Sequence, residues 1–157
     1  MENQSDLNKE FIACWNKVLV PKWNRFRHIL SGNGKVHSDI ALKRVQLREG
    51  LKVLDVGSGY GETCLEFSKL VGPQGEVTGV DCTTEFLKIA ERERDLEKAD
   101  NVTYLAGDIQ SMPLPKAHFD FAFSRFGLMF CQNPVIALKN IYQSLKPGGE
   151  LCAITWR

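Results

Sequence analysis

The sequence lacks an excess of charge of either sign. Its 157 residues carry 20 Lys and Arg against 19 Asp and Glu, which leaves a formal net charge of +1 at pH 7. A polyanionic surface is attracted by a concentration of positive charge, which this composition does not offer in bulk. We therefore expect neither nucleic acid nor a membrane among the partners.

Long hydrophobic runs and paired cysteines are also missing. The longest uncharged stretch, residues 126–138, is interrupted by Gln132, Asn133 and Pro134 and is too short and polar to cross a bilayer; the first residues carry no secretory signal pattern. The five cysteines are widely spaced without a C-x-x-C motif, which argues against a disulfide framework or a zinc site. We expect a cytoplasmic protein with reduced thiols and no bound metal.

The chain has the length of one domain. In its first thirty residues, apolar side chains recur every three or four positions, which predicts two short amphipathic helices on either side of Pro21. The same spacing returns over residues 36–47. We therefore predict that residues 1–48 form a helical prefix, or lid, to a core at 49–157, within one structural unit.

From residue 51 onward, short apolar runs alternate with helical patterns, which is typical of a parallel sheet covered by helices on both faces. Five strands are predicted, at 52–56, 76–80, 102–105, 119–124 and 150–156. The helices between them are predicted at about 60–71, 84–98 and 134–145.

The most informative stretch is residues 53–62, Val-Leu-Asp-Val-Gly-Ser-Gly-Tyr-Gly-Glu, where a buried strand runs into three alternate glycines and then a helix. Gly57, Gly59 and Gly61 allow a tight turn and let a ligand approach the backbone, and the helix offers unpaired amides at its N-terminus. A strand-to-helix turn without a ligand would show the same glycines, so the acidic residues nearby carry the interpretation further.

Two acids follow the next two predicted strands. Asp81 lies 20 residues after Gly61, where a carboxylate can accept hydrogen bonds from both hydroxyls of a ribose. Asp108 follows the third strand and is placed to accept from an exocyclic amino group, with Ile109 covering a base. Asp108 could instead be only a turn residue or a helix cap.

The glycine spacing distinguishes between two ligands. A pyrophosphate fingerprint reads G-x-G-x-x-G, whereas here Gly61 comes two positions after Gly59 and is followed by the acidic Glu62. Asp55 adds a second negative charge that suits the ammonium group of an amino acid. A ligand with a ribose and a cation is favoured, and an NAD(P)-dependent oxidoreductase is the less favoured alternative.

These residues resemble the class I S-adenosylmethionine-dependent methyltransferases. The resemblance covers residues 51–156 and rests on the glycine motif, on Gly-Val-Asp at 79–81, on Ala-Gly-Asp-Ile at 106–109 and on Leu-Lys-Pro-Gly-Gly at 145–149. It implies a Rossmann-like doubly wound sheet with strand order 3-2-1-4-5 in the part present. It also implies S-adenosyl-L-methionine as cofactor and S-adenosyl-L-homocysteine as product.

The resemblance assigns roles to particular positions. It implies contacts to the methionine moiety around Asp55, Gly57, Ser58 and Gly59, ribose hydroxyls on Asp81, adenine between Cys82 and Ile109, and the adenine amino group on Asp108. Gly61 completes the glycine motif. Ser124 and Arg125, after the fourth strand, are implied to face the sulfonium and the acceptor.

The fourth-strand segment Ser-Arg-Phe-Gly-Leu-Met-Phe at 124–130 looks like the small-molecule branch of the family, similar to quinone-biosynthesis and natural-product methyltransferases. We expect methyl transfer to a small acceptor by in-line displacement, which needs alignment and exclusion of water more than a dedicated base. The sequence does not identify a catalytic residue; His37 is a candidate for a base, and Arg125 either binds an acidic acceptor or is structural.

The family's sheet has seven strands in the order 3-2-1-4-5-7-6, and this sequence stops after the fifth. A fragment, a protein completed by a partner or a second copy, and a decayed relative all remain open. A non-catalytic cofactor-binding or interaction module is therefore an alternative to the enzyme, and the bare fifth-strand edge predicts self-association or a partner.

Overall fold

The computed structural model describes residues 8–27 and 34–156. Residues 1–7 and 28–33 of the predicted helical prefix lie outside the described part. The helices and strands follow one another as α1 (Lys9–Cys14), η2 (Trp15–Leu19), α2 (Val20–Arg25), α4 (Lys35–Leu42), β1 (Lys52–Val56), α5 (Glu62–Val71), β2 (Glu76–Asp81), α6 (Thr84–Glu97), β3 (Val102–Ala106), β4 (Phe119–Arg125), η3 (Leu128–Phe130), α7 (Pro134–Ser144) and β5 (Leu145–Ile154).

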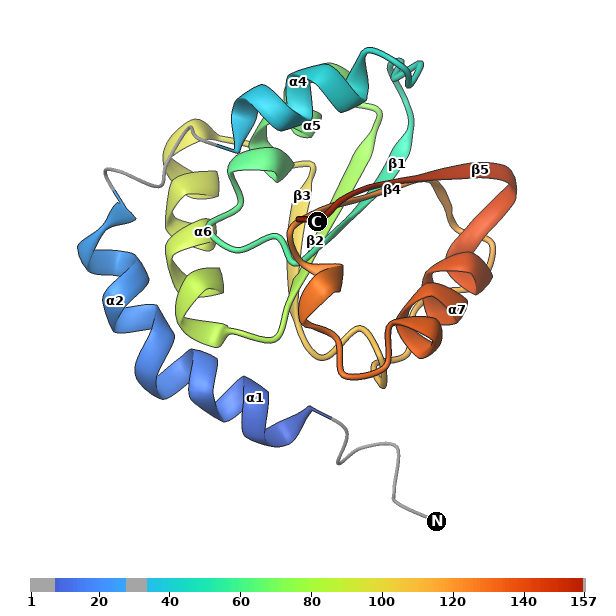
Figure 1. Ribbon diagram of the computed structural model, residues 1–157. Coiled ribbons are helices and arrows are strands. Elements are labelled where there is room, and N and C mark those ends of the chain that lie inside the picture. The colour runs from blue at the N-terminus through green and yellow to red at the C-terminus, as the bar shows by residue number, and fades with distance from the viewer. Residues whose placement is uncertain (1–7, 28–33, 157) are drawn as a thin grey trace.

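The five strands form one parallel sheet in the order β3-β2-β1-β4-β5, with α5 and α6 on one side and α7 on the other (Figure 1). This order confirms the fold predicted from the sequence. Helices α5, α6 and α7 form the crossovers from β1 to β2, from β2 to β3 and from β4 to β5, whereas β3 connects to β4 through residues 107–118, which form no helix.

Side chains alternate between the two faces of each strand, and each face has its own core. On β1, Val53 faces the cluster that includes Phe67 of α5, whereas Leu54 and Val56 face the cluster that includes Ile141 of α7. By this alternation Asp55 points to the α5 face. The pattern explains why the predicted strands are nearly continuous runs of apolar residues.

The N-terminal segment corrects one prediction. Two separate helices were expected around Pro21, but α1, η2 and α2 form one uninterrupted helical run in which η2 is a π-helical turn. Proline cannot donate to the carbonyl one turn earlier and its ring crowds that carbonyl; the wider π turn directly before it relieves the conflict without breaking the run.

The third predicted helix is shorter than expected, because α4 ends at Leu42 instead of continuing to residue 47. Val45 and Leu47, which supplied the apparent helical spacing, pack against the α5-side core from non-helical backbone. Apolar spacing alone did not distinguish these two conformations.

The last strand was predicted at 150–156, but β5 begins earlier, at Leu145, and ends at Ile154. The Lys-Pro-Gly-Gly segment is accommodated by a register shift opposite Phe119 and Phe121 of β4. No residue of β5 is buried, whereas β1 and β4 are buried along most of their length. As predicted, β5 is an edge of the sheet. Among the described residues, no helix is long and apolar enough to span a membrane.

Candidate functional site

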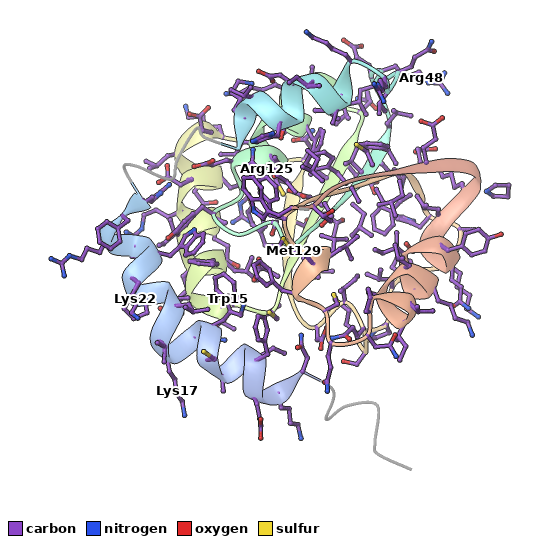
Figure 2. All side chains as sticks on the ribbon, viewed as in Figure 1. Trp15, Lys17, Lys22, Arg48, Arg125 and Met129 are labelled. Carbon is purple, nitrogen blue, oxygen red and sulfur yellow. The ribbon has the colours of Figure 1, made fainter. Side chains whose placement is uncertain are left out.

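A cavity of about 710 Å³ opens at the carboxyl edge of the sheet, the edge where ligands bind in open α/β folds. Its floor comes from the segments that follow the five strands. Its other walls come from the N-terminal helical run and from α4. In Figure 2, Trp15 lies on the side of the helical run that faces the sheet, whereas Lys17 and Lys22 project away from it.

The glycine turn is fixed by backbone hydrogen bonds. The Gly57 N–H donates to the Val80 carbonyl at 2.8 Å, which ties the turn to β2, and the Gly61 N–H donates to the Ser58 carbonyl at 2.9 Å. Gly61 has φ +79°, and a Cβ there would lie 2.1 Å from the Tyr104 hydroxyl. Position 61 therefore requires glycine for both conformation and space. Helix α5 begins at Glu62, two residues later than predicted.

Gly59 and Asp81 meet at the centre of the cavity floor. The Gly59 N–H donates to Asp81 Oδ2 at 2.8 Å, and the Thr83 N–H donates to Oδ1 at 2.7 Å, which fixes the orientation of the carboxylate. Burial raises the pKa of Asp81 above its ordinary value, although both amides act in the opposite direction. Each carboxylate oxygen keeps a lone pair for a ligand hydroxyl.

Asp108 is held by a residue that the sequence analysis did not single out. The backbone N–H and the side-chain Nε2 of Gln110 both donate to Asp108 Oδ1, at 3.0 and 3.1 Å, and the Gln110 Oε1 accepts from the Asn133 N–H at 2.7 Å. Gln110 is 3% exposed. Its hydrogen bonds to Asp108 and Asn133 link the loop after β3 to the start of α7. Its position two residues after an acid gave no recognisable motif.

The two predicted adenine contacts lie beside Asp108 on the cavity wall. Ile109 is 6% exposed and belongs to the α7-side core. Burial raises the pKa of the Cys82 thiol to about 11, so this side chain is neutral at physiological pH and presents a small, weakly polar surface.

Three predicted site residues do not reach the cavity wall: Asp55, Gly61 and Ser124. Asp55 is 1% exposed and accepts hydrogen bonds from the Thr63 hydroxyl and the Cys64 thiol of α5. Burial raises its pKa to about 6. The Ser124 hydroxyl donates to the Val56 carbonyl at 2.8 Å and accepts from the Leu128 N–H. Both side chains hold the floor together from beneath.

Arg125 lies on the wall below α4 in Figure 2 and connects three elements. Its Nη1 donates to the Ser38 hydroxyl of α4 at 3.2 Å, and its Nη2 lies 3.6 Å from Glu62 Oε2 at the start of α5. The guanidinium thus braces α4 against the glycine turn, although a side-chain exposure of 18% leaves part of it accessible from the cavity.

His37 also lines the cavity, together with two aromatic residues that the sequence analysis did not single out. Phe126 and Trp156 are stacked with ring centroids 4.6 Å apart and an interplanar angle of 2°. His37 stands nearly perpendicular to both, with centroid distances of 5.7 and 5.8 Å. No local motif could have joined these residues, because they come from α4 and from the ends of β4 and β5.

A second aromatic group closes the opposite side. Trp15 is buried against Trp23, Phe86 and Phe130 with centroid distances of 5.5, 6.2 and 5.1 Å. All four line the cavity, so the helical run contributes its apolar side to the wall and packs on α6 at the same time. Trp15 and Trp23 therefore line the cavity and pack the helical run onto the core in one cluster.

This architecture defines a class: an α/β protein with a glycine turn and acidic rim residues that suit a nucleoside-bearing ligand. Comparison with known proteins names the family. The methyltransferase domain model matches residues 47–157. The chain belongs to this family, as the sequence resemblance indicated.

Two curated relatives are methyltransferases whose names refer to quinones. The ubiquinone/menaquinone biosynthesis C-methyltransferase UbiE of Psychromonas ingrahamii is 31% identical over 153 residues, which cover 96% of this chain and 61% of the relative. A demethylmenaquinone methyltransferase of Staphylococcus aureus is 34% identical over 148 residues, with 94% and 61% coverage. The chain thus spans about three fifths of the length of these relatives.

A solved structure supports the same assignment. A SAM-dependent methyltransferase from Aquifex aeolicus aligns with a TM-score of 0.71 and 32% identity, over 76% of this chain and 63% of that chain. The family's cofactor is S-adenosylmethionine, as predicted.

The cavity fits this cofactor by three observations. A Cβ on Gly59 would meet no atom within 4 Å, so the turn leaves room for a ligand to approach the backbone. The Ser58 hydroxyl, on the wall, is buried and has no hydrogen-bond partner in the part of the chain that the structure describes. The carboxylates of Asp81 and Asp108 provide acceptors for hydroxyl and amino groups.

Proposed function

We propose that the chain binds S-adenosylmethionine in this cavity and transfers its methyl group to a small-molecule acceptor. The observation that carries the proposal is the hydrogen bond between Gly59 and Asp81, which places an open backbone turn beside an oriented carboxylate on the cavity floor. The names of the two curated relatives support an acceptor of the quinone-precursor kind.

The proposed binding mode follows the order of the strands along the sheet edge. Asp108, after β3, accepts from the adenine amino group, and Cys82 and Ile109 flank the base. Asp81, after β2, accepts from the ribose hydroxyls. The turn at Gly57, Ser58 and Gly59, after β1, receives the methionine moiety. Gly61 and Ser124 support the turn from beneath, and Asp55 bonds to the first residues of α5 below it.

Methyl transfer from a sulfonium depends on alignment and exclusion of water more than on an individual catalytic side chain. When bound, S-adenosylmethionine would supply a methyl group on a positively charged sulfur: an acceptor atom bonds to the methyl carbon as the carbon–sulfur bond breaks, and the electron pair stays on the sulfur of S-adenosylhomocysteine. The protein holds the two reactants in alignment and excludes water, which is worth several kcal/mol in a well-oriented reaction. The aromatic cluster around Trp15 and the brace formed by Arg125 serve this purpose by closing two sides of the cavity.

The test is calorimetric titration of the 157-residue chain with S-adenosylhomocysteine, with NADH as the control ligand. We expect binding in the micromolar range that is lost in Asp81→Ala, and no binding of NADH. A folded chain that binds neither ligand would contradict the proposal. Transfer is then measured as incorporation of a labelled methyl group from S-adenosylmethionine into reduced naphthoquinones.

We also propose that a second copy of the chain or a partner pairs with the edge of β5. The support is that, among residues 8–27 and 34–156, β5 pairs only with β4, and that no residue of β5 is buried. Light scattering tests this proposal, and a monodisperse monomer would contradict it.

A further inference from the structure

We propose that His37, Phe126 and Trp156 form an aromatic wall that selects a planar, ring-bearing acceptor. This inference rests on the proposed function and assigns the acceptor subsite of the same cavity. The observation behind it is the parallel stacking of Phe126 on Trp156, with His37 perpendicular to both.

The position of the wall separates it from the cofactor residues. The proposed cofactor contacts follow β3, β2 and β1, which form one half of the sheet. Phe126 and Trp156 follow β4 and β5, which form the other half. The two sets meet at Gly57, where a Cβ would lie only 2.7 Å from the Gly127 Cα. The wall therefore begins where the methionine end of the cofactor is proposed to lie.

The wall lines the same cavity as the aromatic cluster around Trp15, which is buried to 8% exposure. Two stacked rings leave two flat outer faces, and a third planar ring adds to such a pair by offset stacking. An imidazole at the edge of that surface can also donate or accept a hydrogen bond, which suits a ring that carries a hydroxyl or carbonyl group.

The backbone at Phe126 is a second, independent observation. Its φ is +61°, a left-handed conformation that disfavours a bulky residue, and its N–H donates to the Ile154 carbonyl at 2.8 Å. Glycine would adopt this conformation without strain. The presence of phenylalanine means that the fold holds an aromatic ring at this place against a backbone preference, a situation concentrated at ligand sites.

The experiment compares two probes of equal carbon skeleton, 2-naphthol and decahydro-2-naphthol. Binding of each to the full chain is measured by calorimetry, with and without saturating S-adenosylhomocysteine. We expect the planar probe to bind about fivefold more tightly than the saturated one, the contribution of aromatic stacking beyond apolar contact. Equal affinities would overturn the proposal.

Variants distinguish recognition from packing. Phe126→Leu and Phe126→Gly both remove the ring, but only glycine also relieves the backbone strain. We expect both to lose the preference for 2-naphthol, while the melting temperature of Phe126→Gly stays within about 4 °C of the wild type. Trp156→Leu should lose the preference as well. Tyr142→Leu, which removes an exposed ring on α7 away from the cavity, is the control and should keep it.

Failure of the two proposals is distinguishable. If S-adenosylhomocysteine does not bind, the proposed function fails, and the preference for 2-naphthol is still measured in its absence. If S-adenosylhomocysteine binds and the preference is absent, or survives in Phe126→Gly, the aromatic wall is overturned and the proposed function stands.

Discussion

The two ends of the cavity are built in different ways. Above β1, β2 and β3, each site residue lies within a few positions of the end of its strand, and backbone amides fix the acidic side chains. Above β4 and β5, the wall joins His37, Phe126 and Trp156 from widely separated parts of the chain. The first end depends on local turns and the second on tertiary packing, so mutations at the two ends should have different consequences.

The largest effect is expected at the turn itself. In Gly61→Ala, the new methyl group would strain a backbone at φ +79° and overlap the Tyr104 hydroxyl. We expect the free energy of unfolding to fall by about 4 kcal/mol or more and cofactor binding to be lost, as measured by urea denaturation and calorimetry.

Two matched variants separate the cost of backbone strain from the cost of steric overlap. Gly148 has φ +80° and Gly59 has φ +53°, and a Cβ at either would meet no atom within 4 Å. Alanine at each should therefore cost only the conformational part, about 1 kcal/mol. Gly59→Ala should also weaken S-adenosylhomocysteine binding by tenfold or more, whereas Gly148→Ala should not. Equal affinities in the two variants would mean that no ligand approaches the turn.

The next largest effect is expected at Asp55, in the pH dependence of the free energy of unfolding. Because burial raises its pKa from 3.8 to about 6, the folded state prefers the protonated carboxyl. Its contribution to stability is present below about pH 4 and is lost as the pH rises through 6, a difference of about 2 to 3 kcal/mol. Asp55→Asn cannot ionise, so the stability of the wild type relative to this variant should fall by that amount between pH 4 and pH 8.

Urea denaturation across this pH range measures the difference, and titrating groups that do not interact with Asp55 cancel between the two proteins. A constant difference would show that Asp55 is ionised in the folded state. Since Asp55 lies beneath the floor and not on it, we also expect S-adenosylhomocysteine to bind the variant with nearly unchanged affinity at pH 6.

These outcomes reflect what the sequence could reveal. The strand order and the positions of Asp81 and Asp108 were predictable, because a buried strand ends where the apolar run ends and the next residue then lies at the sheet edge. The placement of Asp55 beneath the floor follows from strand alternation, but a motif does not distinguish a residue facing α5 from one facing a ligand.

Two of the three misplaced elements share a cause. The π-helical turn before Pro21 adjusts to the local geometry of proline, whereas the early end of α4 and the early start of β5 depend on contacts with distant residues, which apolar spacing does not encode. The same holds for Gln110, whose side chain joins Asp108 to Asn133, and for the aromatic wall.

A smaller effect than that of Asp55 is expected at Asp81. Asp81→Asn keeps the shape of the side chain but removes the charge and replaces one acceptor oxygen by an amide donor facing either Gly59 or Thr83. We expect S-adenosylhomocysteine to bind about 30-fold more weakly, or about 2 kcal/mol. Asp95→Asn, at an exposed position on α6, is the control and should bind normally. If both variants bind alike, Asp81 is not a ligand contact.

The smallest effect is expected at Arg125, where the two ends of the cavity are joined. Lysine keeps the positive charge but cannot bond to Ser38 and Glu62 at once, because it lacks the fork of the guanidinium. Since the ion pair is partly exposed to solvent, the loss should be about 1 kcal/mol and confined to the attachment of α4. Amide hydrogen exchange over Lys35–Leu42 should therefore quicken about fivefold in Arg125→Lys, with no change in β1 or β2. Lys69→Met, which breaks an exposed ion pair with Glu97, should leave α4 unchanged. Faster exchange throughout the sheet would mean that Arg125 supports the core, and the separation between a locally built end and a packed end would then not hold.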